Sequence, residues 1–181
     1  RYLFGGPFID TQQPPGYPFL IGLVNLILRG DGVDAAKAVD LAFGVLVLLP
    51  FYGLAKDLLG RLPAVVLGVV LALTPLAIRY SVTTMSESPY VFFLVAATLA
   101  ARREKDLAAG ALVGLAFLIR PEGLILGPAL GLGRGFRPRA WGMILAGGLL
   151  FGAIPAIVFN HHTTGAWTLT KKGVNIIGDD F

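Results

Sequence analysis

The residues most able to do chemistry are charged side chains that interrupt long apolar stretches. Arg120 and Glu122 form the sequence RPEG inside one such stretch. A charged side chain at membrane depth costs about 3 kcal/mol on insertion scales and is a functional candidate by default. A guanidinium matches phosphate oxygens bidentately, so Arg120 could hold the phosphate of a lipid carrier. Alternatively, Arg120 and Glu122 could pair with each other or cap the neighbouring helices.

Glu87 is the candidate catalytic carboxylate. Ser88 and Pro89 predict the N-cap and first turn of a helix, so Glu87 is expected near the positive end of a helix dipole. An interaction with that dipole could be its whole role. It could also bind a metal or orient a sugar hydroxyl, and the same helix start could receive a phosphate through its backbone N–H groups.

Three further polar pairs complete the candidates. Arg79–Tyr80 could contact a donor phosphate or anchor a helix at the membrane interface. His161–His162 follows a long apolar stretch, and adjacent side chains diverge, which disfavours joint metal binding. Lys171–Lys172 could attract lipid headgroups or acceptor phosphates, or lie in a solvated loop.

The composition defines the class of protein that must position these residues. Hydrophobic residues make up 55% of the 181 positions and charged residues 14%, whereas soluble domains carry about 25% charged residues. Residues 140–160 hold no charge over 21 positions, and roughly 20 apolar residues span a bilayer core as a helix. The apolar stretches lack the alternation of barrel strands. We therefore predict an all-α membrane protein, a polytopic bundle of transmembrane helices.

Composition also bears on cofactors and partners. The chain has no Cys, which excludes a disulfide framework and a thiolate zinc site. Its net charge of +4 is not arranged as a basic run interleaved with aromatic residues, so no nucleic-acid partner is predicted. The cofactor is unknown, and no metal ligand is assigned. Carboxylates and His161 could nevertheless bind a divalent metal.

We expect residues 1–181 to form a single transmembrane domain. The predicted elements are an external segment over 1–37 with an interfacial helix at 17–28, transmembrane helices over 38–160, and an external loop over 161–181. Within 38–160 the spans are 38–55 with a kink at Pro50, 62–78, a helix from Pro89 to the charged cluster at Arg102, and 140–160. Residues 107–133 are broken at RPEG into arms of 13 and 11 residues, which predicts a short hairpin with its turn at membrane depth.

Basic residues suggest an orientation in the membrane. The positive-inside rule favours a cytoplasmic location for the loops that flank the hairpin. Four polar segments then meet on the opposite, outer side: PPGYP, Arg79–Tyr80 with the loop after it, RPEG, and HHTTGAW. Eight basic residues are expected inside and seven outside, and the inner ones are Lys56, Arg61, Arg102, Arg103, Lys105, Arg134, Arg137 and Arg139.

These segments, in this order, resemble the GT-C superfamily of integral membrane glycosyltransferases. The branch of protein O-mannosyltransferases and lipid A aminoarabinose transferases is the most similar. The resemblance covers nearly the whole chain. It is carried by PPGYP, by the run from LLPFYGLAKDLLGR to TMSESPYVFFL, by GLAFLIRPEGLILGP and by TTGAWTLTKKGVN.

The resemblance implies transfer of a sugar from a polyprenyl-phosphate carrier to an acceptor on the extracytoplasmic side of a membrane, here a prokaryotic plasma membrane. Arg120 would stabilise the leaving phosphate, and Glu87 would occupy the acidic position of the second external loop. The remaining implied roles are donor-phosphate contact by Arg79, Tyr80 and Glu122, a lipid-carrier entrance at Pro14, Pro15 and Tyr17, and an acceptor or headgroup side at His161, Lys171 and Lys172.

One family feature has no counterpart here. The family's general base follows a first transmembrane helix that precedes the Pro-Pro motif, and Asp10 lies too near PPGYP to match it. We therefore expect residues 1–181 to be part of a longer protein and to be inactive alone. Two alternatives to the transferase are a secondary transporter or lipid flippase, which also uses broken helices with charges at membrane depth, and a membrane scaffold without catalytic activity.

Overall fold

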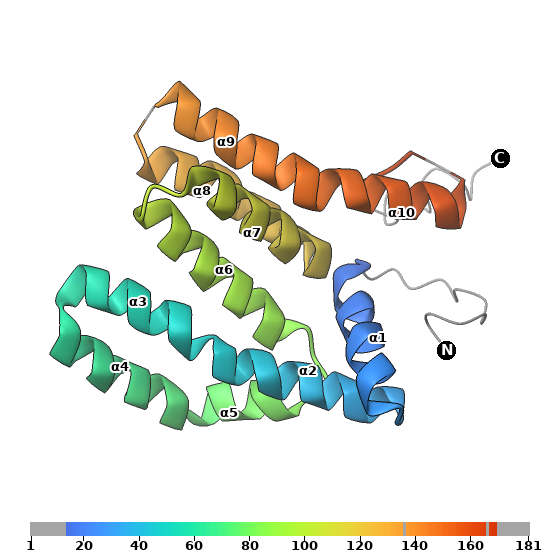
Figure 1. The fold of residues 1–181 in the computed structure, drawn as a ribbon, viewed down its shortest axis with the longest axis horizontal. Coiled ribbons are helices and arrows are strands. Elements are labelled where there is room, and N and C mark those ends of the chain that lie inside the picture. The colour runs from blue at the N-terminus through green and yellow to red at the C-terminus, as the bar shows by residue number, and fades with distance from the viewer. Residues whose placement is uncertain (1–13, 136, 166, 170–181) are drawn as a thin grey trace, which may run out of the picture.

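The computed structural model describes residues 14–135, 137–165 and 167–169, and the regular secondary structure of this part of the chain is all helical (Figure 1). The helices, in chain order, are α1 (Gly16–Leu28), α2 (Gly32–Leu46), α3 (Leu48–Leu59), α4 (Arg61–Leu73), α5 (Pro75–Val82), α6 (Glu87–Arg102), α7 (Asp106–Ile119), the 3-10 turn η1 (Pro121–Ile125), α8 (Leu126–Gly133), α9 (Pro138–Gly148), the π-helical segment η2 (Leu149–Ala153) and α10 (Ile154–Thr164).

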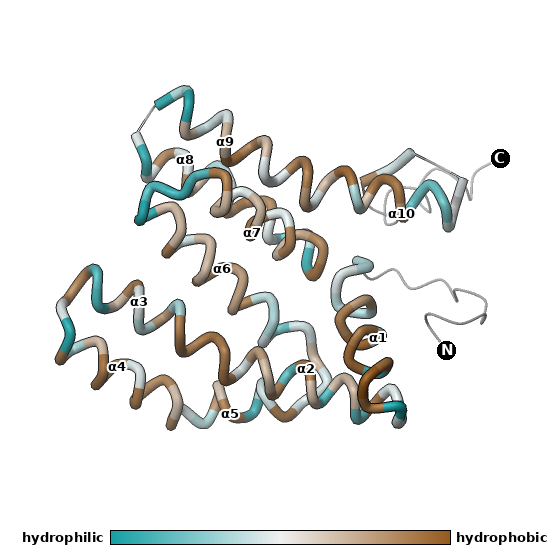
Figure 2. The backbone as a smooth tube through the Cα atoms, viewed as in Figure 1, coloured by the Kyte–Doolittle hydropathy of each residue, from teal (hydrophilic) through white to brown (hydrophobic). Residues whose placement is uncertain are grey.

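Two helical stretches of the described residues are long and apolar enough to cross a membrane, namely Gly32–Leu59 and Pro138–Thr163. A third span results if the bent pair α4 and α5 counts as one. Large apolar side chains such as Leu49 and Leu62 point outward, as lipid-facing residues do, and Figure 2 shows apolar residues along most of the helices. The prediction of an all-α integral membrane protein is therefore confirmed.

The first long span differs in detail from the prediction. Its helix begins at Gly32, whereas the sequence analysis began the span at residue 38 and assigned 32–37 to the external segment. The interruption between α2 and α3 lies at Val47. Pro50 explains this position, because it has no N–H to donate to the carbonyl of Leu46.

The predicted span over 62–78 is not one straight helix. Helix α4 ends at Leu73, and α5 starts at Pro75 with a bend of 57° between them. The residue between them, Thr74, has an extended backbone with φ −67° and ψ 121°, as expected for a residue that precedes proline. The bend turns α5 back against α2, where Gly44 faces the Cβ atom of Ser81.

The helical hairpin predicted over 107–133 is present. Helix α7 runs to Ile119, the chain turns at Arg120 and η1, and α8 returns beside α7. The two open ends of the hairpin meet, since Nε of Arg134 lies 3.1 Å from a carboxylate oxygen of Asp106. At the turn, a Cβ atom on Gly123 would lie 2.7 Å from the backbone nitrogen of Phe117.

The last span packs on this hairpin through glycines. A Cβ atom on Gly114 of α7 would lie 2.7 Å from the backbone nitrogen of Gly152. One on Gly147 of α9 would lie 2.5 Å from the backbone nitrogen of Ala111. Small residues allow such close helix approach in membranes. Gly110 of α7 thus packs against Ile144 of α9, and Gly114 packs against η2.

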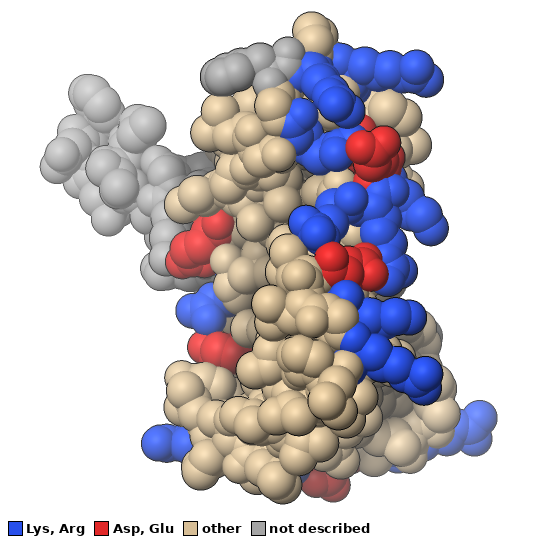
Figure 3. Space-filling view, turned by 90° about the vertical axis from the view of Figure 1, so that its left-hand side faces the viewer, with Lys and Arg blue, Asp and Glu red and all other residues tan. Residues whose placement is uncertain are grey.

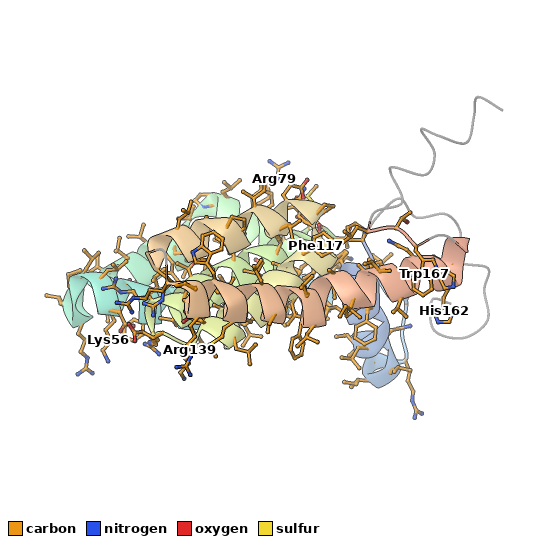
Figure 4. The ribbon with its side chains drawn as sticks, turned by 90° about the horizontal axis from the view of Figure 1, so that it is seen from above. Lys56, Arg79, Phe117, Arg139, His162 and Trp167 are labelled. Carbon is orange, nitrogen blue, oxygen red and sulfur yellow. The ribbon has the colours of Figure 1, made fainter. Side chains whose placement is uncertain are left out.

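The bundle has two chemically different ends. At one end, Arg103 pairs with Asp57 at 2.8 Å and Arg134 pairs with Glu104 at 3.2 Å, and Figure 3 shows Lys and Arg side chains gathered there. We call this the basic end. Lys56 and Arg139 lie at this end, whereas His162 and Trp167 lie at the other (Figure 4). Helix α1 lies across the bundle on the side away from the basic end (Figure 1).

Candidate functional site

Arg120 and Glu87, which are 33 residues apart in the sequence, form an ion pair. Nη1 of Arg120 donates to Oε1 of Glu87 at 2.8 Å. The two residues meet because α7 runs antiparallel to α6, so the end of α7 lies beside the start of α6. Pro121 disfavours a helical conformation at Arg120, whose extended backbone ends α7. The structure thus joins the two strongest candidates of the sequence analysis.

Two other groups contact the Arg120 guanidinium. Nε lies 3.8 Å from a carboxylate oxygen of Glu122, an ion pair that is too long for a hydrogen bond. The ring of Tyr90 lies 5.7 Å from the guanidinium carbon, which is within cation–π range. The alternative in which Arg120 pairs mainly with Glu122 is therefore less favourable than pairing with Glu87.

The start of α6 was predicted two residues too late. The helix begins at Glu87, with Ser86 as its N-cap residue. Ser88 does not cap the helix, because its hydroxyl donates to the carbonyl oxygen of Tyr80 at 3.0 Å. Glu87 therefore lies in the first helical turn, where the helix dipole favours a carboxylate.

The pair retains unused hydrogen-bonding capacity. Oε2 of Glu87 is buried and has no hydrogen-bond partner among the described residues. Arg120 is about one-third exposed, at 36% of its side-chain surface, and a guanidinium carries five N–H donors. The only hydrogen bond of the guanidinium within the described part of the chain is the one to Glu87. The remaining donors could bind an anion such as a phosphate.

A second polar contact lies next to this pair and was missed by sequence reasoning. Asp40 of α2 is fully buried, and its Oδ2 accepts from the hydroxyl of Tyr17 at 2.8 Å and from the N–H of Met85 at 3.1 Å. The sequence analysis treated Asp40 only as a marker of a span's start. The available signal was a carboxylate just inside the start of a predicted membrane span, which marks a functional candidate.

The predicted lipid-carrier entrance lies at the start of α1. Pro14 and Pro15 are half-buried, and Tyr17 is buried. A Cβ atom on Gly16 would lie 2.6 Å from the carbonyl oxygen of Leu118, so α1 begins against the end of α7, two residues before Arg120. Burial raises the pKa of Tyr17, which keeps its hydroxyl protonated as a donor to Asp40.

Other predicted site residues lie apart from Arg120. Arg79 is exposed and points away from the bundle (Figure 4), and within the described residues its side chain forms no ion pair. Tyr80 contributes its backbone carbonyl to Ser88, while its side chain is partly exposed. The structure thus brings Glu87, Arg120 and Glu122 together but leaves Arg79 outside that group.

His161 and His162 lie in the last turn of α10, although they were expected in the loop after the span. The His161 ring stacks on the ring of Trp167, with centroids 3.8 Å apart and planes 10° from parallel. In the described part of the chain, no three His, Cys, Asp or Glu side chains lie together as a metal site would require. Lys171, Lys172 and Asp10 lie outside the described residues.

Comparison with known proteins identifies the family. A family model described as dolichyl-phosphate-mannose-protein mannosyltransferase matches residues 12–158, which is more than half of the chain and includes Glu87 and Arg120. No match was found among curated proteins or among solved structures. The family match confirms the resemblance to GT-C glycosyltransferases and favours this class over a transporter or a scaffold. The chain therefore belongs to the dolichyl-phosphate-mannose-protein mannosyltransferase family of integral membrane glycosyltransferases.

Proposed function

We propose that the protein transfers a sugar from a polyprenyl-phosphate carrier to an acceptor on the extracytoplasmic side of a prokaryotic plasma membrane. The observation that carries this proposal is the Arg120–Glu87 ion pair at the turn of the α7–α8 hairpin. The pair is partly exposed, and an arginine held in this way is suited to a phosphate that arrives from the membrane.

In the proposed reaction, the bond between the sugar and the carrier phosphate breaks, and the phosphate leaves with the bonding electrons. Negative charge therefore grows on the phosphate in the transition state. Preorganised donors aimed at developing charge are usually the largest single catalytic contribution. Arg120 provides such donors, and Glu87 fixes their direction through the 2.8 Å hydrogen bond.

The carrier's polyprenyl chain would remain in lipid beside the bundle. The start of α1 supports an entrance at Pro14, Pro15 and Tyr17, because it packs against the end of α7 close to Arg120. The carrier phosphate would then pass the start of α1 to reach the guanidinium. These residue roles are proposals that rest on proximity.

The proposed sidedness follows from charge. The basic end carries the exposed Lys56 and Arg139 (Figure 4), and basic loops are retained in the cytoplasm. The hairpin that ends in Arg120 has its open end, with Arg134 and Asp106, at the basic end. Its turn therefore points toward the extracytoplasmic side.

The test uses the full-length protein in liposomes with a panel of radiolabelled polyprenyl-phosphate sugars and native membranes as the source of acceptor. We expect label to be released from one donor, and Arg120→Ala to reduce that release by about 100-fold, the size of loss seen when one donor to a developing anion is removed. Arg103→Ala is the matched control, because this arginine also has a carboxylate partner at 2.8 Å but lies at the basic end.

If no donor is consumed, the transferase proposal is wrong. A substrate-driven flux across the liposome membrane would then identify a transporter. Equal losses in Arg120→Ala and Arg103→Ala would contradict the assignment of the phosphate site to Arg120.

A further inference from the structure

We propose that Asp40 is a positioning residue of the donor site, which keeps helix α1 and Glu87 in a fixed relation to each other. The inference rests on the proposed function, because it assigns Asp40 a role in that reaction. Asp40 does not contact Arg120, so its effect would pass through the two groups that donate to it.

The contact has two branches that share one oxygen atom. Through Tyr17, Oδ2 of Asp40 holds α1, the helix at the proposed carrier entrance. Through the Met85 N–H, the same oxygen holds the backbone two residues before Glu87. Because the acceptor is shared, a displacement of α1 changes the hydrogen bond that places the Glu87 backbone.

The other hydrogen bonds that restrain the Glu87 backbone are local in sequence, including the one from the Ser88 hydroxyl to the carbonyl oxygen of Tyr80. The Met85 N–H is shared with the carbonyl oxygen of Thr83 at 2.8 Å, a contact that spans only two residues. Helix α6 begins immediately afterwards, at Glu87. Through Met85, Asp40 therefore ties the short segment before α6 to α2. Glu87, at the start of α6, in turn orients Arg120.

A buried carboxylate at position 40 is not explained by folding stability. Asp40 is fully buried, and its Oδ1 is without a hydrogen-bond partner in the described part of the chain. Buried charges are costly, and apolar residues of similar volume often serve stability equally well. An acceptor is needed at this position to align the Tyr17 hydroxyl and the Met85 N–H, which both donate to it.

Three variants of the full-length protein separate the branches, with the polyprenyl-phosphate sugar that supports turnover as the probe. Asp40→Leu removes the acceptor of both hydrogen bonds. In Asp40→Asn, the amide oxygen can take the position of Oδ2 and accept from both donors. The amide nitrogen then takes the position of Oδ1, which forms no hydrogen bond with the described residues, so no existing bond is lost. Tyr17→Phe removes only the α1 branch. Asp34→Asn is the control, an exposed carboxylate on the same helix that forms an ion pair with Lys37.

We expect Asp40→Leu to lower kcat by about 100-fold, the loss typical of a displacement of about 1 Å at a catalytic group. Asp40→Asn should restore most of kcat. Tyr17→Phe should raise KM for the donor by about tenfold, as expected for one lost hydrogen bond to a charged group. It should lower kcat far less than Asp40→Leu does, because the hydrogen bond from Met85 to Asp40 remains. Equal loss of kcat in Asp40→Asn and Asp40→Leu, or a comparable loss in Tyr17→Phe, would overturn the proposal.

Hydrogen–deuterium exchange in detergent provides a readout that needs no turnover. The Met85 amide should exchange faster in Asp40→Leu than in the wild type and remain protected in Asp40→Asn. Unchanged exchange in Asp40→Leu overturns the proposal whether or not the wild-type protein releases sugar. A wild type that releases no sugar refutes the proposed function instead.

Discussion

The guanidinium of Arg120 is held from one side and open on the other. A solvent-accessible ion pair contributes only about 0–1 kcal/mol to stability after the cost of ordering two side chains and screening by solvent. The Arg120–Glu87 pair is therefore better explained by orientation than by stability. Glu87 accepts a hydrogen bond from one nitrogen of the guanidinium, and the Tyr90 ring lies near the guanidinium carbon. Other N–H groups of Arg120 remain available to an anion.

At this scale we predict strong coupling between Glu87 and Arg120 in a double-mutant cycle. Glu87→Gln alone should slow sugar release, because Arg120 loses the charged acceptor that directs it. In the Arg120→Ala background the same change should have little further effect, which gives an interaction energy on the order of 1 kcal/mol or more. The rate constants of release for the four proteins in liposomes measure this energy.

Glu122→Gln is the comparison for this cycle. Glu122 is more exposed than Glu87, at 64% against 26%, and lies 3.8 Å from Arg120. Its coupling to Arg120 should be clearly smaller. If Glu122 couples as strongly as Glu87, the hydrogen bond at 2.8 Å is not what directs the guanidinium.

The sequence was sufficient to find Arg120 and Glu87 but not to pair them. Each stands out as a charge beside an apolar stretch, and the cost of such charges in lipid makes them candidates. Their pairing depends on how α6 and α7 pack, which no local pattern encodes. Asp40 was missed for the same reason, since its partners Tyr17 and Met85 are 23 and 45 residues away.

At the scale of elements, breaks in helices decide where polar groups end up. The RPEG turn was recognisable because charges and a proline coincide in it. The bend at Thr74–Pro75 was not predicted, because Thr74 is uncharged and the apolar stretch continues past it. The Thr-Pro dipeptide was the available signal, since a residue before proline avoids the helical region.

We predict that the interface between α7 and η2 tolerates no side chain at Gly114. In Gly114→Val, the added Cβ atom would meet the backbone of Gly152, for which the distance is 2.7 Å. Overpacking of this kind typically costs about 1–3 kcal/mol, so the thermal denaturation midpoint in detergent should fall.

Gly142→Ala on α9 is the matched control, because an added Cβ atom there meets no heavy atom within 4 Å. The thermal denaturation midpoint of Gly142→Ala should stay unchanged or rise slightly, because alanine favours a helix more than glycine does. A Gly114→Val protein as stable as Gly142→Ala would show that α7 and η2 are not in close contact.

At the scale of the whole molecule, charge separates the two ends of the bundle. The eight basic residues expected inside include Arg103, Arg134 and Arg137, which form ion pairs at the basic end. The number of basic residues expected inside exceeds the number expected outside by only one. Their grouping at one end of the structure is a stronger argument for the predicted orientation. The sidedness itself remains a prediction.

Single cysteines test that sidedness, because this chain contains no native Cys. We predict that His162→Cys reacts with a membrane-impermeant maleimide in intact cells. Arg139→Cys, at the basic end, should react only after permeabilisation (Figure 4). The reverse pattern would place the Arg120–Glu87 pair on the cytoplasmic side and contradict transfer on the extracytoplasmic side.

The helix that carries Asp40 also indicates a depth. Lys37 and Lys56 are both exposed, and the 18 residues between them rise about 27 Å, close to the thickness of a hydrocarbon core of about 30 Å. Asp40 lies three residues inside Lys37, about 4.5 Å along the helix axis. Asp40 and the Met85 backbone bonded to it then lie just beneath the headgroup layer. A carrier phosphate could therefore approach by lateral diffusion within its own leaflet, without being lifted into water.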